Sequence, residues 1–317
     1  MFASRDPRDY CAQTARQYDT AKKFEKEWEQ IVMRRFYVKL IVTFCTVCLT
    51  VLFFFSYTAW EAGQVEFSEK TVSFSNLPKS FDGLRVLQIS DLHARFLSDE
   101  SLWDRLLSER PDLTVFTGDT FDRDSDEEDL AAVGEIVRRF AQVSKVYYVG
   151  GNHETHEELW ERAVTVVTEN GGEVLSDRAV SLSRENEEIS VVGLRDPLRR
   201  QSPDPAQKTQ RDLTVDALET LSGKTSDFSL LLAHRPEDVE WYSRYGFDLV
   251  LSGHTHGGQI RLPLLGAVFA PSQGFFPKYS AGEYQVGDTT LYVSRGLGGE
   301  HRLLCPPEVT LFTLKTA

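Results

Sequence analysis

Five short apolar runs, at residues 84–90, 113–117, 146–150, 228–233 and 247–252, each lead directly into a polar cluster. Runs of this length and composition are typical of strands buried in a sheet. In an α/β sheet, ligands bind outside the carboxyl ends of the strands. The pattern therefore predicts an α/β domain in which five polar clusters meet at one site.

The clusters share carboxylate, carboxamide and imidazole side chains. In chain order they read Asp91-x-His93, Gly118-Asp119-x-x-Asp122, Gly151-Asn152-His153-Glu154, His234 and Gly253-His254-x-His256. Such ligands suit Mn²⁺, Fe or Zn²⁺, and no cluster contains a cysteine that would favour a thiolate site. For any one of these histidines alone a hydrogen-bonded structural role is favoured, but five ordered clusters together favour a metal site.

This order of motifs resembles the calcineurin-like binuclear metallophosphoesterase superfamily from about Val65 to the C-terminus. The resemblance implies a two-sheet β-sandwich flanked by helices and two divalent metals, with Mn²⁺ favoured. It implies one metal on Asp91, His93 and His256, a second on Asn152, His234 and His254, and Asp119 bridging the two.

The resemblance also implies a reaction, the hydrolysis of a phosphoester or phosphoanhydride by a metal-bridging hydroxide that attacks phosphorus in line. His153 maps onto the catalytic histidine that protonates the leaving oxygen or hydrogen-bonds the phosphoryl group. Asp122 and Glu154 are expected to support the ligands from behind. The roles of His156 and His301 stay open. We expect the acidic run 122–129, beyond its first residue, to cap a helix from Glu127 to Phe140.

A second feature is the uncharged segment 40–57, which is just long enough to cross a bilayer core. Tyr37, Tyr57 and Trp60 flank it at interfacial depth, and it lies too far from the N-terminus for an ordinary signal peptide. We predict a charged tail at 1–35 with helix-forming stretches near 20–30, a membrane anchor at 36–60 and a metallophosphoesterase domain at 61–317. The alternative is a core helix of the domain.

Charge gives partial answers about partners and topology. Arg34, Arg35 and Lys39 precede the apolar segment, which favours a cytoplasmic N-terminus by the positive-inside rule. A net charge of −13 gives no reason to expect binding to nucleic acid, and no protein partner is predicted.

The four cysteines, Cys11, Cys45, Cys48 and Cys305, form no visible disulfide framework. We expect the stretch 195–212 to be a flexible loop.

The segment after the last cluster is unusually apolar at 259–270 and 274–277. It is expected either to line a lipid-sized groove or to continue the sheet with its phenylalanines packed beneath. Together with the anchor, Gly-His-Thr-His-Gly-Gly-Gln-Ile-Arg-Leu-Pro and the terminal Cys-Pro-Pro-Glu-Val-Thr-Leu resemble a membrane-anchored bacterial subgroup of the superfamily.

That resemblance implies an inner-membrane enzyme of lipid metabolism. Its leading specific substrate is UDP-2,3-diacylglucosamine, a lipid A precursor cleaved to UMP and the lipid monophosphate. This substrate is made on the cytoplasmic face, in conflict with the charge-based topology unless the segment only dips into one leaflet. The alternatives are a general metallophosphodiesterase or phosphatase and a catalytically idle scaffold. Residues that contact the substrate are not predicted.

Overall fold

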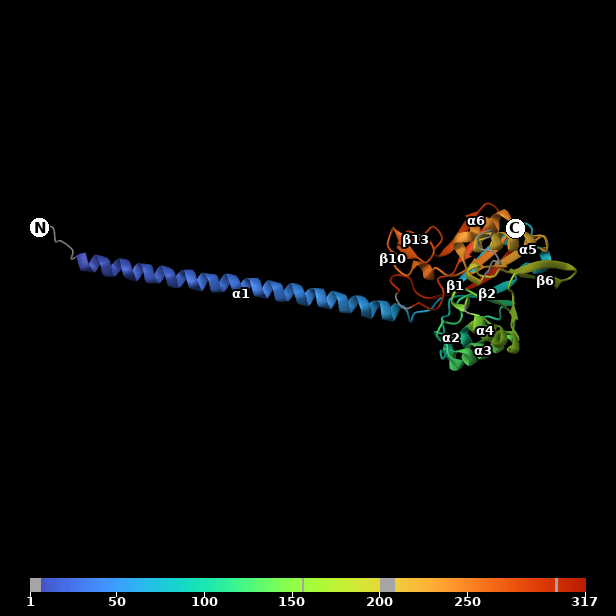
Figure 1. Cartoon of the computed structure of the whole chain (residues 1–317), viewed down its shortest axis with the longest axis horizontal. Coiled ribbons are helices and arrows are strands. Elements are labelled where there is room, and N and C mark those ends of the chain that lie inside the picture. Colours follow the sequence, from blue (N-terminus) through green and yellow to red (C-terminus); the bar gives the residue numbers. More distant parts are fainter. Residues whose placement is uncertain (1–6, 156, 200–208, 300–301) are drawn as a thin grey trace. The chain divides into compact units, whose positions relative to one another are not determined.

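The computed structural model describes residues 7–155, 157–199, 209–299 and 302–317 (Figure 1). The chain divides into two units, residues 1–57 and 58–317. Most of the first unit is helix α1, Pro7–Glu61, which runs without interruption through the predicted charged tail and the predicted anchor. The last turn of α1, from Thr58, belongs to the second unit.

Helix α1 is long and apolar enough to cross a membrane. The stretch Lys22–Glu61 contains an 18-residue window with a mean hydropathy of 2.4, and none of that window is buried. Large side chains such as Phe44, Leu49 and Phe53 are exposed along it. A helix that is hydrophobic on all sides is poorly suited to water, which agrees with a membrane helix.

The second unit is built on two six-stranded sheets. The first sheet has the order β1 (Glu66–Phe74), β16 (Glu308–Thr316), β2 (Arg85–Ile89), β3 (Leu113–Thr117), β4 (Lys145–Val149) and β5 (Glu173–Val174). The second has the order β14 (Gly282–Val286), β15 (Thr289–Val293), β9 (Leu249–Ser252), β8 (Ser229–Leu232), β7 (Glu187–Gly193) and β6 (Arg178–Arg184). Neighbours pair in parallel from β2 to β5 and from β15 to β7.

The sheets pack face to face, and helices cover their outer faces. One buried cluster joins Val86 and Val115 of the first sheet to Leu230 and Leu249 of the second. Their neighbours along the strands, such as Leu87, face a second cluster. Strands with both faces buried read as continuous apolar runs, which is why the sequence pattern predicted them.

The helices form the outer layers (Figure 1). Helices α2 (Glu100–Ser108), α3 (Glu127–Ala141) and α4 (Glu157–Glu169) pack on the first sheet, while α5 (Gln210–Ser222) and α6 (Val239–Arg244) pack on the second. The predicted α/β fold of two sheets flanked by helices is confirmed, as are all five strands within about two residues. The helix expected at Glu127–Phe140 is also confirmed, and Asp126 caps its first turn.

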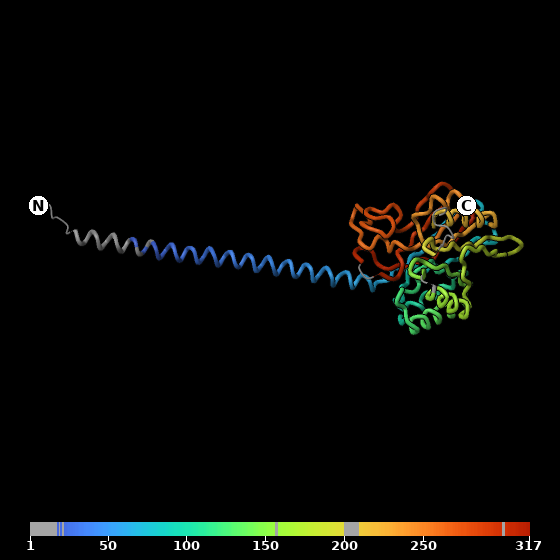
Figure 2. The backbone as a smooth tube through the Cα atoms, viewed as in Figure 1, coloured from blue at the N-terminus to red at the C-terminus, as the bar shows by residue number. Residues whose placement is uncertain are grey.

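Three segments lie beside this framework. The β6–β7 hairpin extends beyond the rest of the second unit (Figure 2). The apolar segment after the last cluster folds into two short hairpins, β10 (Arg261–Leu262) with β11 (Gly266–Ala267) and β12 (Phe269–Ala270) with β13 (Gly274–Phe275). Its phenylalanines are exposed, so the expectation that they pack beneath the sheet is wrong. Residues 200–208 of the expected loop lie outside the described residues.

Candidate metal centre

The polar clusters converge because both sheets end their parallel strands at the same edge. Strands β2, β3 and β4 lead into Asp91, Asp119 and Asn152, while β8 and β9 lead into His234 and His254. Backbone hydrogen bonds join neighbouring loops, with the N–H of Asp91 donating to the oxygen of Gly118 at 3.0 Å and that of Gly253 to the oxygen of His234 at 3.1 Å. The site is therefore assembled across the sandwich.

One group of ligand atoms belongs to Asp91, His93 and His256, which lie within 4.8 Å of one another. Nε2 of His256 is 3.8 Å from Oδ1 of Asp91. The same carboxylate accepts hydrogen bonds from the Ser90 hydroxyl at 2.6 Å and from the N–H of His254 at 2.9 Å. These hydrogen bonds hold the Asp91 carboxylate in one orientation, as hydrogen bonds to a metal ligand usually do.

A second group belongs to Asp119, His234 and His254, again within 4.8 Å. Nε2 of His234 lies 3.2 Å from Oδ2 of Asp119 and 3.3 Å from Oδ1 of Asn152. Nδ1 of His234 donates to the backbone oxygen of Thr117 at 2.8 Å. Because a carbonyl only accepts, this bond places the ring hydrogen on Nδ1 and leaves Nε2 toward the ligand group.

Asp119 lies between the two groups. Its Oδ2 is 3.2 Å from His234 in the second group and 3.8 Å from Nε2 of His93 in the first. Its Oδ1 accepts a hydrogen bond from the N–H of His153 at 2.8 Å. All seven residues expected as metal ligands are thus brought to one place, and the Asp119 carboxylate lies near both groups.

The backbone is strained where these ligands sit. Five of the seven have φ in the left-handed region, where residues other than glycine are rare: Asp91 (48°), His93 (49°), Asp119 (48°), His254 (70°) and His256 (48°). Such a conformation costs about 1–3 kcal/mol per residue and persists only where the surrounding structure imposes it. Positive φ also occurs elsewhere, for example at Arg110 and Glu185, but at this site it affects five residues that carry candidate ligand atoms.

Two of the ligand histidines are held neutral. Burial, with His234 and Arg235 adding to it, lowers the pKa of His254 to about 2, and burial lowers the pKa of His256 to about 4. His234 behaves differently: burial opposes its charge, but the Asp119 carboxylate raises its pKa to about 10. A metal bound by His234 must therefore displace a proton.

The donor set fits two divalent cations. Among the described residues, Nε2 of His93 and Nδ1 of His256 are buried without a hydrogen-bond partner. A buried polar atom left unpaired costs about 1–3 kcal/mol, and a cation in this site would remove that cost. Oxygen and neutral imidazole donors suit Mn²⁺, Fe or Zn²⁺. Asp91, His93 and His256 would hold one ion and Asn152, His234 and His254 the other.

Glu154 organises the loops behind the ligands. Its side chain is fully buried and accepts four backbone N–H bonds, from Asp119 at 3.2 Å, Thr120 at 2.7 Å, Phe121 at 3.0 Å and Gly151 at 2.9 Å. One carboxylate thus ties the loop after β3 to the loop after β4. Burial and the charge of Asp119 raise the pKa of Glu154, although the N–H bonds oppose that shift.

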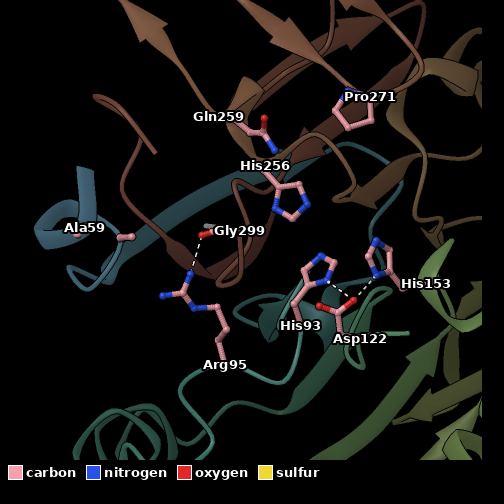
Figure 3. Close-up of a pocket in the computed structure, with 10 residues that line it drawn as sticks. Ala59, His93, Arg95, Asp122, His153, His256, Gln259, Pro271 and Gly299 are labelled. Carbon is pink, nitrogen blue, oxygen red and sulfur yellow. Dashed lines mark hydrogen bonds and ion pairs between the residues drawn. The ribbon is translucent and has the colours of Figure 1, made fainter. Parts of the chain in front are cut away.

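Asp122 contacts two histidines at the front of the site (Figure 3). Its Oδ1 lies 2.7 Å from Nδ1 of His153 and 3.9 Å from Nδ1 of His93. The nearby His93 ring, together with hydrogen bonds from the N–H of Arg123 and from His153, lowers the pKa of Asp122 well below its ordinary value. An ionised Asp122 accepts from Nδ1–H of His153 and so fixes the orientation of that ring.

A cavity of about 690 Å³ opens in front of these side chains (Figure 3). His93, Asp122, His153 and His256 line one part of it. Its remaining walls include residues that were not predicted as site residues: Ala59, Ala62, Arg95, Gln259, Pro271 and Gly299. The Arg95 guanidinium donates to the oxygen of Gly299 at 2.8 Å. An arginine and a glutamine beside a metal site are suitable donors for phosphoryl oxygens.

Further residues support the second group. Arg235 lies 3.4 Å from Nε2 of His254 and donates to the Ser272 hydroxyl at 2.9 Å, while an ion pair with Asp196 holds its guanidinium in place. The position of Arg235 directly after His234 could have suggested a role at the site. No sequence pattern could have suggested Ser272, because only folding brings it near His254. His156 and His301 lie outside the described residues.

Comparison with known proteins identifies the class to which this arrangement belongs. Residues 84–258 match the family model of the calcineurin-like phosphoesterases. The chain is 33% identical to "Uncharacterized metallophosphoesterase YkuE" of Bacillus subtilis, with 81% of this chain and 87% of the relative covered. It is 30% identical to "Phosphodiesterase YaeI" of Escherichia coli, with 73% and 82% covered.

A vertebrate relative, the "Transmembrane protein with metallophosphoesterase domain" of Danio rerio, is 28% identical over 78% of this chain and 56% of its own length. The chain therefore belongs to the calcineurin-like phosphoesterase family. It is a metal-dependent phosphoesterase with an apolar N-terminal helix.

Proposed function

We propose that the protein is a membrane-anchored phosphohydrolase with two divalent metals, which cleaves a phosphodiester or pyrophosphate bond in a lipid-linked substrate. The observation that carries the proposal is the cavity itself. It is lined by His93, His153 and His256, and also by Ala59 and Ala62, at the end of the helix whose apolar part precedes them. One cavity thus joins the phosphoesterase site to the chain that leads into the apolar segment.

The metals and the side chains of the cavity have different roles in the proposed reaction. Two divalent cations, with Mn²⁺ favoured over Fe or Zn²⁺, would supply hydroxide at neutral pH and neutralise charge on the phosphoryl group. His153 lines the cavity, and its Nδ1 is engaged by Asp122 at 2.7 Å. Its Nε2 is then the atom that gives a proton to the leaving oxygen, which is the role of a general acid. Arg95 and Gln259 bind the phosphoryl or nucleotide part of the substrate.

The specific substrate that we place first is UDP-2,3-diacylglucosamine, cleaved to UMP and the lipid monophosphate in lipid A biosynthesis. A lipid-linked substrate agrees with the apolar helix, because confinement of both molecules to one membrane raises the local concentration of substrate at the site. We place the anchor in the bacterial inner membrane. With this substrate the catalytic unit faces the cytoplasm, against the orientation that Arg34, Arg35 and Lys39 favour.

The test compares a lipid-linked and a soluble substrate. Detergent-purified protein with added Mn²⁺ is given UDP-2,3-diacylglucosamine or bis-p-nitrophenyl phosphate, with Asp119→Ala as the blank. Release of UMP that is lost in the blank supports the lipid pathway. Cleavage of the aryl diester alone supports a general metallophosphodiesterase, which is the second candidate because the E. coli relative carries the name phosphodiesterase.

Two variants separate metal binding from proton transfer. Asp119→Ala removes the carboxylate that lies between both ligand groups, so we expect loss of bound metal and of turnover. His153→Ala removes a side chain outside both predicted ligand sets, so kcat falls by about 10²–10⁴-fold while metal content stays close to two ions per chain. Wild-type turnover in the first variant, or metal loss in the second, contradicts these roles.

A further inference from the structure

The two hairpins beside the cavity expose large apolar side chains. Leu264, Leu265, Phe269, Phe275 and Phe276, here called the hairpin surface, are all well exposed, with Phe275 at 75% and Leu264 completely so. The hairpins adjoin each other, because the N–H of Val268 donates to the oxygen of Ile260 at 2.9 Å and the N–H of Phe276 to that of Val268 at 2.8 Å. Figure 1 shows them together at one end of the catalytic unit.

The placement of these side chains is unfavourable in water. Leu264 has φ of 69° and Phe276 has φ of 54°, in a region where glycine or asparagine is the usual choice. Each hairpin has strands of two residues, so neither contributes a core that needs such bulk. Contiguous exposed apolar side chains on a soluble surface mark an interaction site. The hairpin surface is therefore a candidate interaction surface.

The neighbouring chain indicates which partner this is. Gln259 precedes the first hairpin and Pro271 lies between the two strands of the second, and both line the same cavity as Ala59 and Ala62. Thr58 is buried in the catalytic unit. The apolar segment ends at Tyr57, one peptide bond before Thr58, which is about 3.8 Å between Cα atoms. Whatever the direction of the apolar helix, a bilayer that holds it lies close to this cavity.

We propose that the hairpin surface inserts into the headgroup region of the bilayer that holds the apolar helix. Leucine and phenylalanine side chains enter the boundary between headgroups and acyl chains when they are presented beside a membrane anchor. The catalytic unit is then held at two points, the end of α1 and the hairpins, and the mouth of the cavity faces the lipid surface. This inference depends on the anchor and does not depend on the phosphoesterase chemistry.

The test measures the depth of single fluorescent probes in the full chain. Cys11, Cys45 and Cys48 are replaced by serine, Leu264→Cys or Phe275→Cys is introduced, and the new thiol is labelled with an environment-sensitive fluorophore. Cys305 is buried and stays in place. The protein is reconstituted into phosphatidylethanolamine–phosphatidylglycerol vesicles that contain a phosphatidylcholine carrying a doxyl quencher, either near its headgroup or near the end of its acyl chain.

Two further probes serve as controls. Val143→Cys labels an exposed apolar position after α3, with 49% of the residue exposed, and tests whether exposure alone brings a probe to lipid. Retaining Cys48 as the only labelled cysteine reports on the apolar segment itself. We expect the probes at positions 264 and 275 to lose emission to the shallow quencher more than to the deep one, while the probe at 143 loses emission to neither.

In vesicles whose quenchers reduce the emission of the Cys48 probe, an equal fractional loss of emission at positions 264, 275 and 143 overturns the proposal. The proposal is also overturned if a second copy of the chain covers the hairpin surface. In that case neither quencher lowers the emission of the hairpin probes, and Phe275→Ser lowers the oligomeric mass in detergent. No turnover is measured, so the result stands apart from the outcome of the substrate test. Labelling Leu265→Cys repeats the measurement at a neighbouring position.

Discussion

The carboxylate of Glu154 is expected to hold the two loops that carry Asp119 and Asn152, and Glu154→Gln tests this. The carboxylate has two oxygens, and each accepts two backbone N–H bonds. Glutamine keeps the size of the side chain but replaces one oxygen by an NH₂ group, which only donates. Whichever oxygen is replaced, two backbone N–H groups lose their acceptor and face another donor.

The size of the effect follows from those two bonds. A hydrogen bond to a charged group contributes about 1.5–3 kcal/mol, so the loss of two costs roughly 3–6 kcal/mol. That is a large part of the 5–15 kcal/mol that typically stabilises a domain. For a unit of this size each kcal/mol lowers Tm by about 2–4 °C, so we expect a fall of roughly 6–24 °C. Metal affinity falls as well, because both loops carry ligands.

The assay is thermal unfolding at neutral pH followed by circular dichroism, together with metal content by mass spectrometry. Glu135→Gln is the matched control, because its carboxylate is exposed and pairs with Arg138 on the same helix. The control should retain the Tm and metal content of the wild type. An unchanged Tm in Glu154→Gln would refute the reasoning and would mean that Glu154 is already protonated, as its raised pKa permits.

Three further predictions concern the metal centre. Gly253→Ala should lose metal, because the new Cβ would collide with a carboxylate oxygen of Asp91. Gly223→Ala is the control and should bind metal normally, because Gly223 has φ of −70° and its Cβ would make only ordinary contacts. Equal metal content in the two variants would contradict this prediction. Asp122→Ala should lower kcat with little change in metal content, since His153 loses the acceptor that orients it. An unchanged pH–rate profile would count against that role. Because the pKa of His234 is raised to about 10, metal binding should release a proton, and the affinity for metal should rise about tenfold per pH unit below that value. Calorimetry in two buffers of different ionisation enthalpy measures the proton release. If the ring is already neutral, no proton should be released.

The sequence alone determined the framework, the candidate ligand residues and the apolar helix. Strands such as 113–117 could be predicted because both of their faces are buried, which leaves a continuous apolar run. The candidate ligands could be named because each cluster follows a strand directly, so that local spacing was sufficient. The apolar helix was readable because an uncharged apolar segment of that length matches the thickness of a bilayer core.

Only the tertiary structure decided how these parts act on one another. The left-handed backbone at Asp91 and His254 and the four bonds to Glu154 depend on loops that meet across two sheets. Arg95 and Ser272 reach the site through contacts between segments far apart in the chain, and no local pattern encodes such contacts. The hairpin surface was visible as apolar composition, but composition does not tell exposure from burial. That distinction depends on which other segments cover a side chain, and within the described part of the chain these side chains are exposed.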